Sequence, residues 1–287
     1  MERIAILGMT MALALMASAP CPARTVPHVA SPAGTLDVDV RSDYSHIRVY
    51  RQGSFRTLVF VRDNGEEAVE TMINLRTPHE LLIPYSRYMF TSYLFVPKPK
   101  QVLIIGLGGG AMVHFLQRYD PEVQVDVVEI DSVVVKLAAR HFNTRPTAKV
   151  HIETTDGLRY LETTKTRYDV VYMDAFLKPS QKTDATGVPR GMKTTEFYKN
   201  VQQKLQPEGA MVFNLNVYDA LEKDLRTIRG AFAQVYVFRL DSGNVVAVCT
   251  RDETRVMPSA LLDRGKELDR RFRTSFSFRE MANQMDQ

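Results

Sequence analysis

One continuous stretch, Gln101–Ile130, constrains the fold of this chain more than any other. A short apolar run, Val102–Ile105, predicts a buried strand, and a glycine-rich turn follows it at once. An apolar-periodic helix comes next, and then a second strand that ends on Glu129. A strand, a glycine turn, a helix and a second strand with a terminal acid are typical of a nucleotide-binding βαβ unit.

The glycine turn indicates close contact with a ligand, since side chains there would keep the backbone from closing on a nucleotide. Gly106, Gly108 and Gly110 are therefore predicted to lie at the bound nucleotide. Glu129 follows about 20 residues later, where a carboxylate can hold two ribose hydroxyls. The motif Gly106-x-Gly108-x-x-Ala111 also fits an NAD-binding turn, so the turn alone leaves the class of nucleotide open.

Composition is that of an ordinary soluble protein. The 287 residues are 45% hydrophobic, which suits one large domain with a small appendage. The net charge is +4, and the basic residues are too dispersed to predict nucleic-acid binding. Once a leader is removed only Cys249 remains, and its apolar surroundings predict a buried, unreactive thiol.

The N-terminus resembles a bacterial-type secretory signal peptide. Its apolar segment, Ile4–Ala19, is short for a membrane span of about 20 residues, and small residues follow it. Residues 1–23 are therefore predicted to be cleaved, leaving an exported, periplasmic protein with no membrane span and with residues 24–36 as a linker. An uncleaved anchor, a lipoprotein on Cys21 and a misassigned start codon stay open. The last of these would leave the protein in the cytoplasm.

Residues 37–96 predict a small antiparallel β domain followed by a helix. Short β-type runs are separated by turn residues such as Asp63-Asn64-Gly65. The helix is expected over Leu81–Val96, packed under the nucleotide domain, with one or two of its tyrosines as candidates to line a pocket. The runs are Ile47–Tyr50, Thr57–Val61 and Ala68–Ile73.

Residues 97–252 alternate between strand-like and helix-like patterns. This alternation predicts a Rossmann-like, mainly parallel sheet with helices on both faces. Two final runs, Gln234–Leu240 and Asn244–Thr250, predict a terminal hairpin that adds an antiparallel strand. Residues 253–287 are expected to form a solvated edge helix and a polar tail.

Polar residues stand at the ends of several predicted parallel strands. In open α/β sheets, ligands bind at the carboxyl ends of the strands, so these residues are predicted to form one site. They are Glu129, Asp156 with the adjacent Gly157, Asp174 and Asn214.

Several segments together resemble the spermidine synthase family, and more closely its divergent spermidine-synthase-like branch. The resemblance covers about residues 40–250 and implies a class I methyltransferase-type fold with a seven-stranded sheet behind the small β domain. It also implies a ligand of the S-adenosylmethionine type rather than NAD. The segments are VLIIGLGGGAM, VVEID, TTDGLRYL, YDVVYMDAF, TTEFY and LQPEGAMVFNL.

The resemblance also implies roles for individual residues. Glu129 would hold the ribose hydroxyls, and Asp156 would bind the adenine amino group. Asp174 would deprotonate the attacking amine of a small-molecule acceptor, because an ammonium is not a nucleophile until it loses a proton. Ala175–Lys193 would form a gate over the pocket. No metal is expected, and a homodimer is an option for assembly.

The chain departs from the family pattern at the residues that bind amines. The family clamps the donor's ammonium with an acid in the glycine loop, where this chain has Gly109. At the position of a second family acid this chain has Leu177. A family glutamine of the N-terminal sheet falls near Ser45, and Pro84–Arg87 replaces the family's tyrosine-glutamine-glutamate segment.

The gate adds a further departure through its charge. Its excess of cations is expected to disfavour a polyamine, so putrescine is questioned as the acceptor. The cations are Lys178, Lys182, Arg190 and Lys193, against Asp184.

Two hypotheses from different classes follow. The first is a transferase that moves an aminopropyl or methyl group from decarboxylated S-adenosylmethionine or S-adenosylmethionine to an amine, with Asp174 as base. The second is an exported, non-catalytic domain that keeps the fold. An NAD oxidoreductase is a third hypothesis, for which no acid/base pair can be placed.

Overall fold

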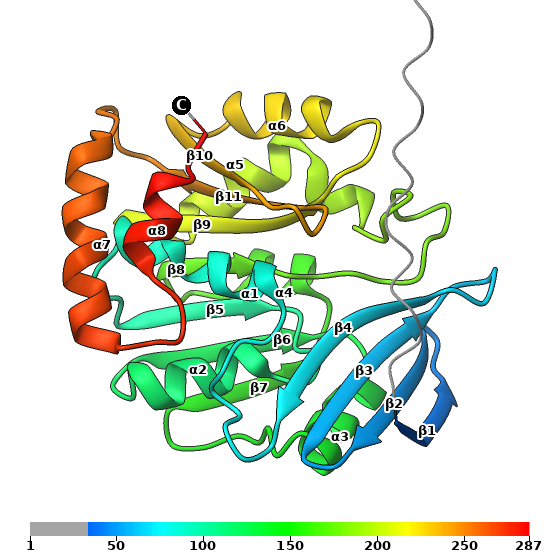
Figure 1. Cartoon of the computed structure of the whole chain (residues 1–287). Coiled ribbons are helices and arrows are strands. Elements are labelled where there is room, and N and C mark those ends of the chain that lie inside the picture. Colours follow the sequence, from blue (N-terminus) through cyan, green and yellow to red (C-terminus); the bar gives the residue numbers. More distant parts are fainter. Residues whose placement is uncertain (1–33, 287) are drawn as a thin grey trace, which may run out of the picture.

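The computed structural model describes residues 34–286, so the predicted signal peptide and most of the predicted linker lie outside the described residues. Residues 34–75 form a four-stranded antiparallel sheet in the order β1-β2-β3-β4 (Figure 1). Its first strand begins at Thr35, inside the range predicted as linker, and makes the sheet one strand larger than the three runs predicted. The strands are β1 (Thr35–Arg41), β2 (His46–Gln52), β3 (Phe55–Val61) and β4 (Glu67–Asn74).

The larger sheet has seven strands in the order β10-β11-β9-β8-β5-β6-β7. Strands β5 to β9 pair in parallel, and β11 pairs antiparallel with both of its neighbours, as the terminal hairpin predicted. Cys249 is buried in β11, and burial raises the pKa of its thiol. The strands are β5 (Gln101–Ile105), β6 (Gln124–Glu129), β7 (Val150–Thr154), β8 (Tyr168–Met173), β9 (Leu205–Asn216), β10 (Gln234–Arg239) and β11 (Asn244–Thr250).

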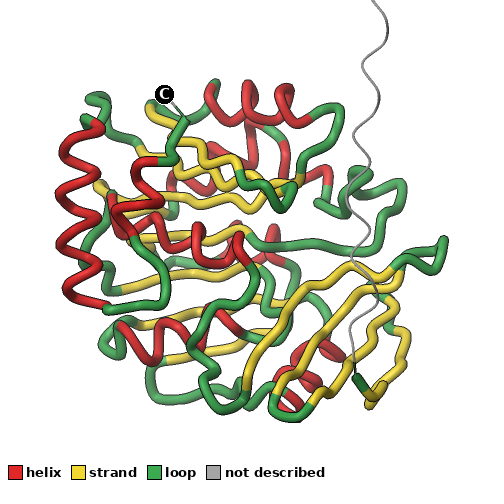
Figure 2. The backbone as a smooth tube through the Cα atoms, viewed as in Figure 1, coloured by secondary structure: helices red, strands yellow, loops and turns green. Residues whose placement is uncertain are grey.

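Helices cover both faces of this sheet, because its strands carry apolar side chains on both sides and must be shielded from water on each (Figure 2). One core lies under α1, α2, α7 and α8, and the other under α4, α5 and α6. The helices are α1 (Pro84–Met89), α2 (Ala111–Tyr119), α3 (Ser132–His141), α4 (Gly157–Thr163), α5 (Thr195–Gln203), α6 (Leu221–Arg229), α7 (Pro258–Phe272) and α8 (Phe278–Asn283), with 3₁₀ turns η1 (Phe90–Leu94) and η2 (Arg190–Lys193).

A third core joins the two sheets. The apolar face of the N-terminal sheet packs on one side of α3 and on the phenylalanine that follows it. This packing brings β4 against the glycine turn after β5, where Thr71 Oγ1 accepts a hydrogen bond of 2.9 Å from the Gly109 amide. The residues of this core are Ile47, Val49, Leu58, Ile73, Val134, Leu137 and Phe142.

The helix predicted over Leu81–Val96 is split in the structure. An α-helix runs from Pro84 to Met89 and tightens into a 3₁₀ helix over Phe90–Leu94, all of whose residues are buried. Such tightening is common in short connecting pieces.

The helix predicted near the C-terminus is present as α7 from Pro258 to Phe272, but the prediction of a polar tail after it is wrong. The tail contains a second helix, α8, and both C-terminal helices bury aromatic side chains in the core. Phe278 is fully buried and packs against Phe272, with their ring centroids 5.6 Å apart. Charged residues dominate the sequence of this segment, so it looks solvent-exposed, but its few phenylalanines form the apolar face that packs on the core.

Two further observations concern residues 34–286. Within them, no helix combines the length and the apolar character that crossing a membrane requires. The same residues bring together no group of His, Cys, Asp and Glu side chains that could hold a metal ion.

Candidate active site

The glycine turn between β5 and α2 touches the strand end that follows β8. Gly106 adopts a φ of +99°, and a Cβ atom there would lie 2.1 Å from the backbone oxygen of Asp174. Only glycine fits this position, because it has no Cβ and tolerates positive φ. The turn therefore lies directly against the predicted catalytic residue.

A cavity of about 910 Å³ opens at the carboxyl ends of the parallel strands. Its volume is typical of a small-molecule site. Six of the eight predicted site residues line it. Gly110 lines a small adjoining cavity that shares Gly106 and Asp174, and Asn214 does not line the main cavity but hydrogen-bonds Asp174. The six are Gly106, Gly108, Glu129, Asp156, Gly157 and Asp174.

Glu129 ends β6 and is 8% exposed. Its Oε2 accepts from the Leu107 amide and its Oε1 from the Asp131 amide, each at 2.9 Å. Burial raises the pKa of Glu129, and these backbone hydrogen bonds oppose the increase. Because each carboxylate oxygen can accept more than one hydrogen bond, the side chain is held in place and can still bind hydroxyls.

Asp156 and Gly157 begin α4 beside the same cavity. Asp156 caps the helix, with its Oδ1 accepting from the Leu158 amide at 2.7 Å. A Cβ at Gly157 would lie 2.7 Å from Ile105 Cγ2. Gly157 thus lets the helix pack closely on β5, and Asp156 lines the cavity beside it.

Asp174 follows β8 and is held by two side chains. Asn214 Nδ2 donates to its Oδ1 at 2.8 Å, and Tyr85 OH donates to its Oδ2 at 3.2 Å. Asn244 Nδ2 in turn donates to Asn214 Oδ1, which fixes the Asn214 amide with its NH₂ toward Asp174. Burial raises the pKa of Asp174, and the two hydrogen bonds from Asn214 and Tyr85 lower it.

Tyr85 bears out the prediction that a tyrosine of its segment lines the pocket. The segment Pro84–Arg87, read from the sequence as a replacement of the family's tyrosine-containing motif, thus still brings a phenol to Asp174. Tyr93 of the same segment lies in the core and donates to Asp120 instead.

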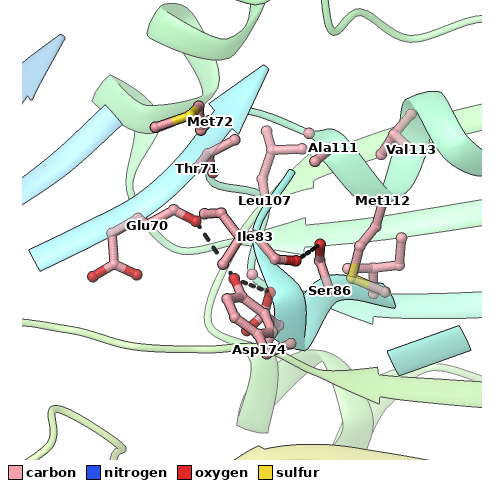
Figure 3. Close-up of a pocket in the computed structure, with 14 residues that line it drawn as sticks. Glu70, Thr71, Met72, Ile83, Ser86, Leu107, Ala111, Met112, Val113 and Asp174 are labelled. Carbon is pink, nitrogen blue, oxygen red and sulfur yellow. Dashed lines mark hydrogen bonds between the residues drawn. The ribbon is translucent and has the colours of Figure 1, made fainter. Parts of the chain in front are cut away.

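Glu70 is a site residue that sequence reasoning missed. It extends from β4 and lines the main cavity, as Asp174 does. Figure 3 shows its carboxylate pointing away from Asp174, while its backbone oxygen accepts a hydrogen bond of 3.4 Å from Tyr85 OH. Burial raises its pKa to about 8, and the charges of Asp174 and Glu129 add to that increase. The available signal was an acid inside the apolar run Ala68–Ile73. The sequence could not show that this acid lines the same cavity as Asp174.

The gate, Ala175–Lys193, lines one side of the cavity, and part of its charge is neutralised. Lys178 Nζ lies 2.5 Å from Asp63 Oδ1 on the β3–β4 turn. Lys193 is largely buried and pairs with Asp184 and Asp224. These pairs offset two of the four gate cations, and the Lys178 pair is exposed and therefore weak.

Acidic residues outnumber basic ones in the lining of the cavity. Among the described residues, six acids and two lysines contribute to it. Such a lining favours a cationic ligand. The acids are Asp43, Asp63, Glu70, Glu129, Asp156 and Asp174, and the lysines are Lys178 and Lys182.

The position of the missing loop acid is physically closed. A Cβ on Gly109 would lie 2.7 Å from Phe142 Cδ1 and 2.8 Å from Thr71 Cγ2. Thr144 Oγ1 also donates to the Gly109 carbonyl at 2.6 Å. Thr71 of β4 and Phe142 after α3 therefore leave no free space for a side chain at this position.

Comparisons with known proteins agree with this geometry. The family model described as the spermine/spermidine synthase domain matches residues 84–242. A polyamine aminopropyltransferase from Vibrio vulnificus is 31% identical over 74% of this chain and 71% of its own length.

Solved structures show the same fold at lower identity. A probable spermidine synthase from Corynebacterium glutamicum superposes with a TM-score of 0.65 at 20% identity, covering 82% of this chain and 88% of that one. Human methyltransferase-like protein 13, in complex with SAH, gives 0.62 at 23% identity over 68% of this chain and 94% of its own. The predicted class I methyltransferase-type fold, with its separate N-terminal β sheet, is confirmed.

Proposed function

This chain belongs to the spermine/spermidine synthase family and is a transferase, and we propose that it alkylates an amine. The donor is decarboxylated S-adenosylmethionine or S-adenosylmethionine, and the acceptor is a small-molecule amine. Asp174 is the general base. Export of the protein and a homodimeric assembly stay predictions from the sequence.

One observation carries the proposal. A single cavity contains the nucleotide-type residues Glu129 and Asp156 together with a buried carboxylate, Asp174, at the adjacent strand end. The neighbour that holds SAH supports an adenosyl ligand in a cavity of this fold. Glu129 would accept from the ribose hydroxyls, and Asp156 would accept from the adenine amino group.

The reaction needs little beyond alignment and one proton transfer. The acceptor amine loses a proton to Asp174, and its lone pair attacks the carbon bound to the donor's sulfonium. The new C–N bond forms as the C–S bond breaks, and the electron pair of that bond stays on sulfur, which becomes a neutral thioether. A sulfonium is already a good leaving group, so the protein mainly brings the two reactants together.

The environment of Asp174 suits this role. Because burial raises its pKa, the carboxylate takes up a proton more readily than an exposed aspartate would. The fixed amide of Asn214 and the phenol of Tyr85 orient the two oxygens. Both oxygens keep lone pairs for the proton of an incoming amine.

Calorimetric titration with methylthioadenosine, S-adenosylmethionine and decarboxylated S-adenosylmethionine tests the proposal. The protein is expected to bind the adenosyl compounds, and Glu129→Ala is expected to weaken binding about 10- to 100-fold, since charge-assisted hydrogen bonds to the ribose are lost. Glu153→Gln, an exposed glutamate at the end of β7, is the matched control and should leave binding unchanged.

Turnover is then followed by chromatography with the preferred donor and 1,4-diaminobutane as amine. Formation of the thioether product supports the transferase. Failure of all three adenosyl compounds to bind would contradict it and would favour a non-catalytic domain that keeps the fold.

A further inference from the structure

A side chamber of about 30 Å³ lies between the gate and the N-terminal sheet. The gate contributes Phe176–Pro179 to its lining, and the sheet contributes Ser45, Arg62 and Glu70. Phe176–Pro179 and Glu70 also line the main cavity, so the side chamber adjoins it. That is room for about two water molecules, so the side chamber admits a terminal group of a substrate and not a whole substrate.

The hydroxyl of Ser45 has no hydrogen-bond partner in the part of the chain that the structure describes. Ser45 is 5% exposed and comes directly before β2. Its amide donates to Ser42 Oγ at 3.0 Å, and its carbonyl accepts from the Ser42 amide at 2.9 Å, so only the side chain is left without a partner. Burying an unpaired hydroxyl costs free energy, which indicates that a bonding partner enters the side chamber.

The side chamber is the basic end of the cavity. Six acids and two lysines line the main cavity, whereas Arg62, Lys178 and His46 line the side chamber with Glu70 as the one acid among the described residues. The Nε2 of His46 lies 2.6 Å from Asp39 Oδ1 on β1 and is thereby engaged. The charge of the side chamber therefore comes from Arg62 and Lys178.

The partners of these two cations are weakly held. Arg62 Nη1 lies 3.2 Å from Glu66 Oε2, and Lys178 Nζ lies 2.5 Å from Asp63 Oδ1. Both carboxylates belong to the β3–β4 turn, and all four side chains are partly or largely exposed. Ion pairs this exposed contribute little free energy, so either cation can exchange its partner for an anionic ligand.

We propose that Ser45, Arg62 and Lys178 form a subsite that binds the carboxylate of an amino-acid acceptor, whose amine reaches Asp174. The inference deepens the proposed function and rests on it. A carboxylate accepts several hydrogen bonds, so it can take one from Ser45 Oγ and others from the two cations. The apolar walls around it, among them Phe176 and Leu177, lower the local dielectric and strengthen these bonds.

Glu70 is compatible with such a ligand. The register of β4 against β3 shifts at this residue, which is the extra residue of a β-bulge between Val69 and Thr71. Bulges of this kind re-aim side chains next to ligand sites. Burial raises the pKa of Glu70 to about 8, so at pH 7 its carboxyl group mostly carries a proton and can donate a hydrogen bond to a carboxylate.

The place of the side chamber favours the acceptor over the donor. Among the described residues, the glycine turn, Glu129 and Asp156 do not line it, although they line the cavities beside it. The proposed donor site therefore lies elsewhere in the main cavity. The carboxylate of an intact S-adenosylmethionine is the other source of the same chemistry, and the test below separates the two.

Calorimetry tests the subsite on the protein saturated with the adenosyl compound that it binds. The probes are ω-amino acids from 3-aminopropanoate to 6-aminohexanoate, a series in which chain length varies the reach from the amine to the carboxylate. Butylamine, with an uncharged end, and 1,4-diaminobutane, with a cationic end, are the comparisons.

Wild type is expected to bind at least one ω-amino acid about tenfold more tightly than butylamine, the effect of a charge-assisted hydrogen bond. Ser45→Ala and Arg62→Gln should each reduce this preference and leave butylamine affinity unchanged. Arg56→Gln is the matched control, since Arg56 begins the same strand and bonds the backbone oxygens of Gly53 and Phe55. Thermal unfolding without ligand checks the fold, and Ser45→Ala should not lower Tm because the hydroxyl has no partner to lose.

Leu177→Asp and Leu177→Asn form a second pair, matched in shape and different in charge. Leu177 lines both the side chamber and the main cavity. An added carboxylate there repels a bound carboxylate, so Leu177→Asp should favour 1,4-diaminobutane over every ω-amino acid. Leu177→Asn should keep the preference of wild type.

The donor arm titrates S-adenosylmethionine and its decarboxylated form into the same variants. Ser45→Ala and Arg62→Gln should leave both affinities unchanged. A loss confined to S-adenosylmethionine would assign the side chamber to the donor's carboxylate and overturn the acceptor subsite.

The remaining outcomes separate the subsite from the proposed function. If wild type binds no adenosyl compound, the proposed function fails and the subsite fails with it. If an adenosyl compound binds but no ω-amino acid is preferred to butylamine, or the preference survives in Ser45→Ala and Arg62→Gln, only the subsite is overturned.

Discussion

The two ends of the cavity are built in different ways. The proposed nucleotide end comes from one sheet, with the glycine turn after β5, Glu129 at the end of β6 and Asp156 after β7. The proposed reaction end joins Asp174, which follows β8 of that sheet, to Tyr85 of α1 and Glu70 of β4. The first end follows from a local βαβ pattern, and the second exists only because two sheets pack against each other.

The two ends also hold their carboxylates differently. Backbone amides hold both oxygens of Glu129, and a backbone amide holds Asp156. Asp174 is held by the side chains of Asn214 and Tyr85. Substitutions should therefore separate nucleotide binding from chemistry at the reaction end.

The largest effect is expected for Asp174→Asn. Loss of a general base should lower kcat about 10²- to 10⁴-fold, whereas methylthioadenosine affinity should hold. Steady-state kinetics and calorimetry measure the two quantities, with the exposed Asp252→Asn as control. A variant that keeps its rate would show that another group takes the proton.

A smaller effect is expected where the N-terminal sheet closes the glycine turn. Gly109→Ala should destabilise the fold by about 1–3 kcal/mol, because the new Cβ overlaps Phe142 and Thr71. Urea unfolding measures the change. Gly230→Ala is the control, since a Cβ there meets its nearest neighbours at 3.5 Å, an ordinary contact distance.

Thr71→Ser sharpens this test. It keeps the hydroxyl that accepts from Gly109 and removes the methyl group that the new Cβ would meet. It should recover part of the stability lost in Gly109→Ala, and the Phe142 contact should account for the rest. Equal stability of the Gly109→Ala and Gly230→Ala proteins would show that the turn is not closed.

The smallest effect is a shift of the pH profile in Tyr85→Phe. The hydrogen bond from Tyr85 lowers the pKa of Asp174, so removing it should raise that pKa further. Because the base must be unprotonated, the acid limb of the kcat profile should move to higher pH, with little change on its plateau. Tyr88→Phe, in the same helix with its hydroxyl at Gln284, should leave the limb in place.

The nucleotide end was largely predictable from sequence. Gly106, Gly108, Glu129, Asp156 and Gly157 were expected at one site, and all of them line one cavity. Strand and helix periodicity predicted the order of the elements, and the polar residues at strand ends then followed from the geometry of a parallel sheet.

The reaction end was predictable only in part. Asp174 was expected from its place after β8, but Glu70 was read as one residue of an antiparallel run. The cationic gate was read from composition, although Lys178 and Lys193 pair with acids far from them in sequence. The polar tail was misread for the same reason, since Phe276 packs on Phe115 of α2 and Phe278 packs on Phe272 of α7.

The sequence alone determined what depends on neighbours along the chain: the glycine turn, the alternation of strands and helices, and the acids at strand ends. The tertiary structure decided what depends on distant partners, namely the closed position at Gly109, the paired lysines of the gate and the place of Glu70 in the cavity lining. The physical reason is that periodicity and backbone geometry are local, whereas burial and charge pairing are set by residues that meet only when the two sheets pack.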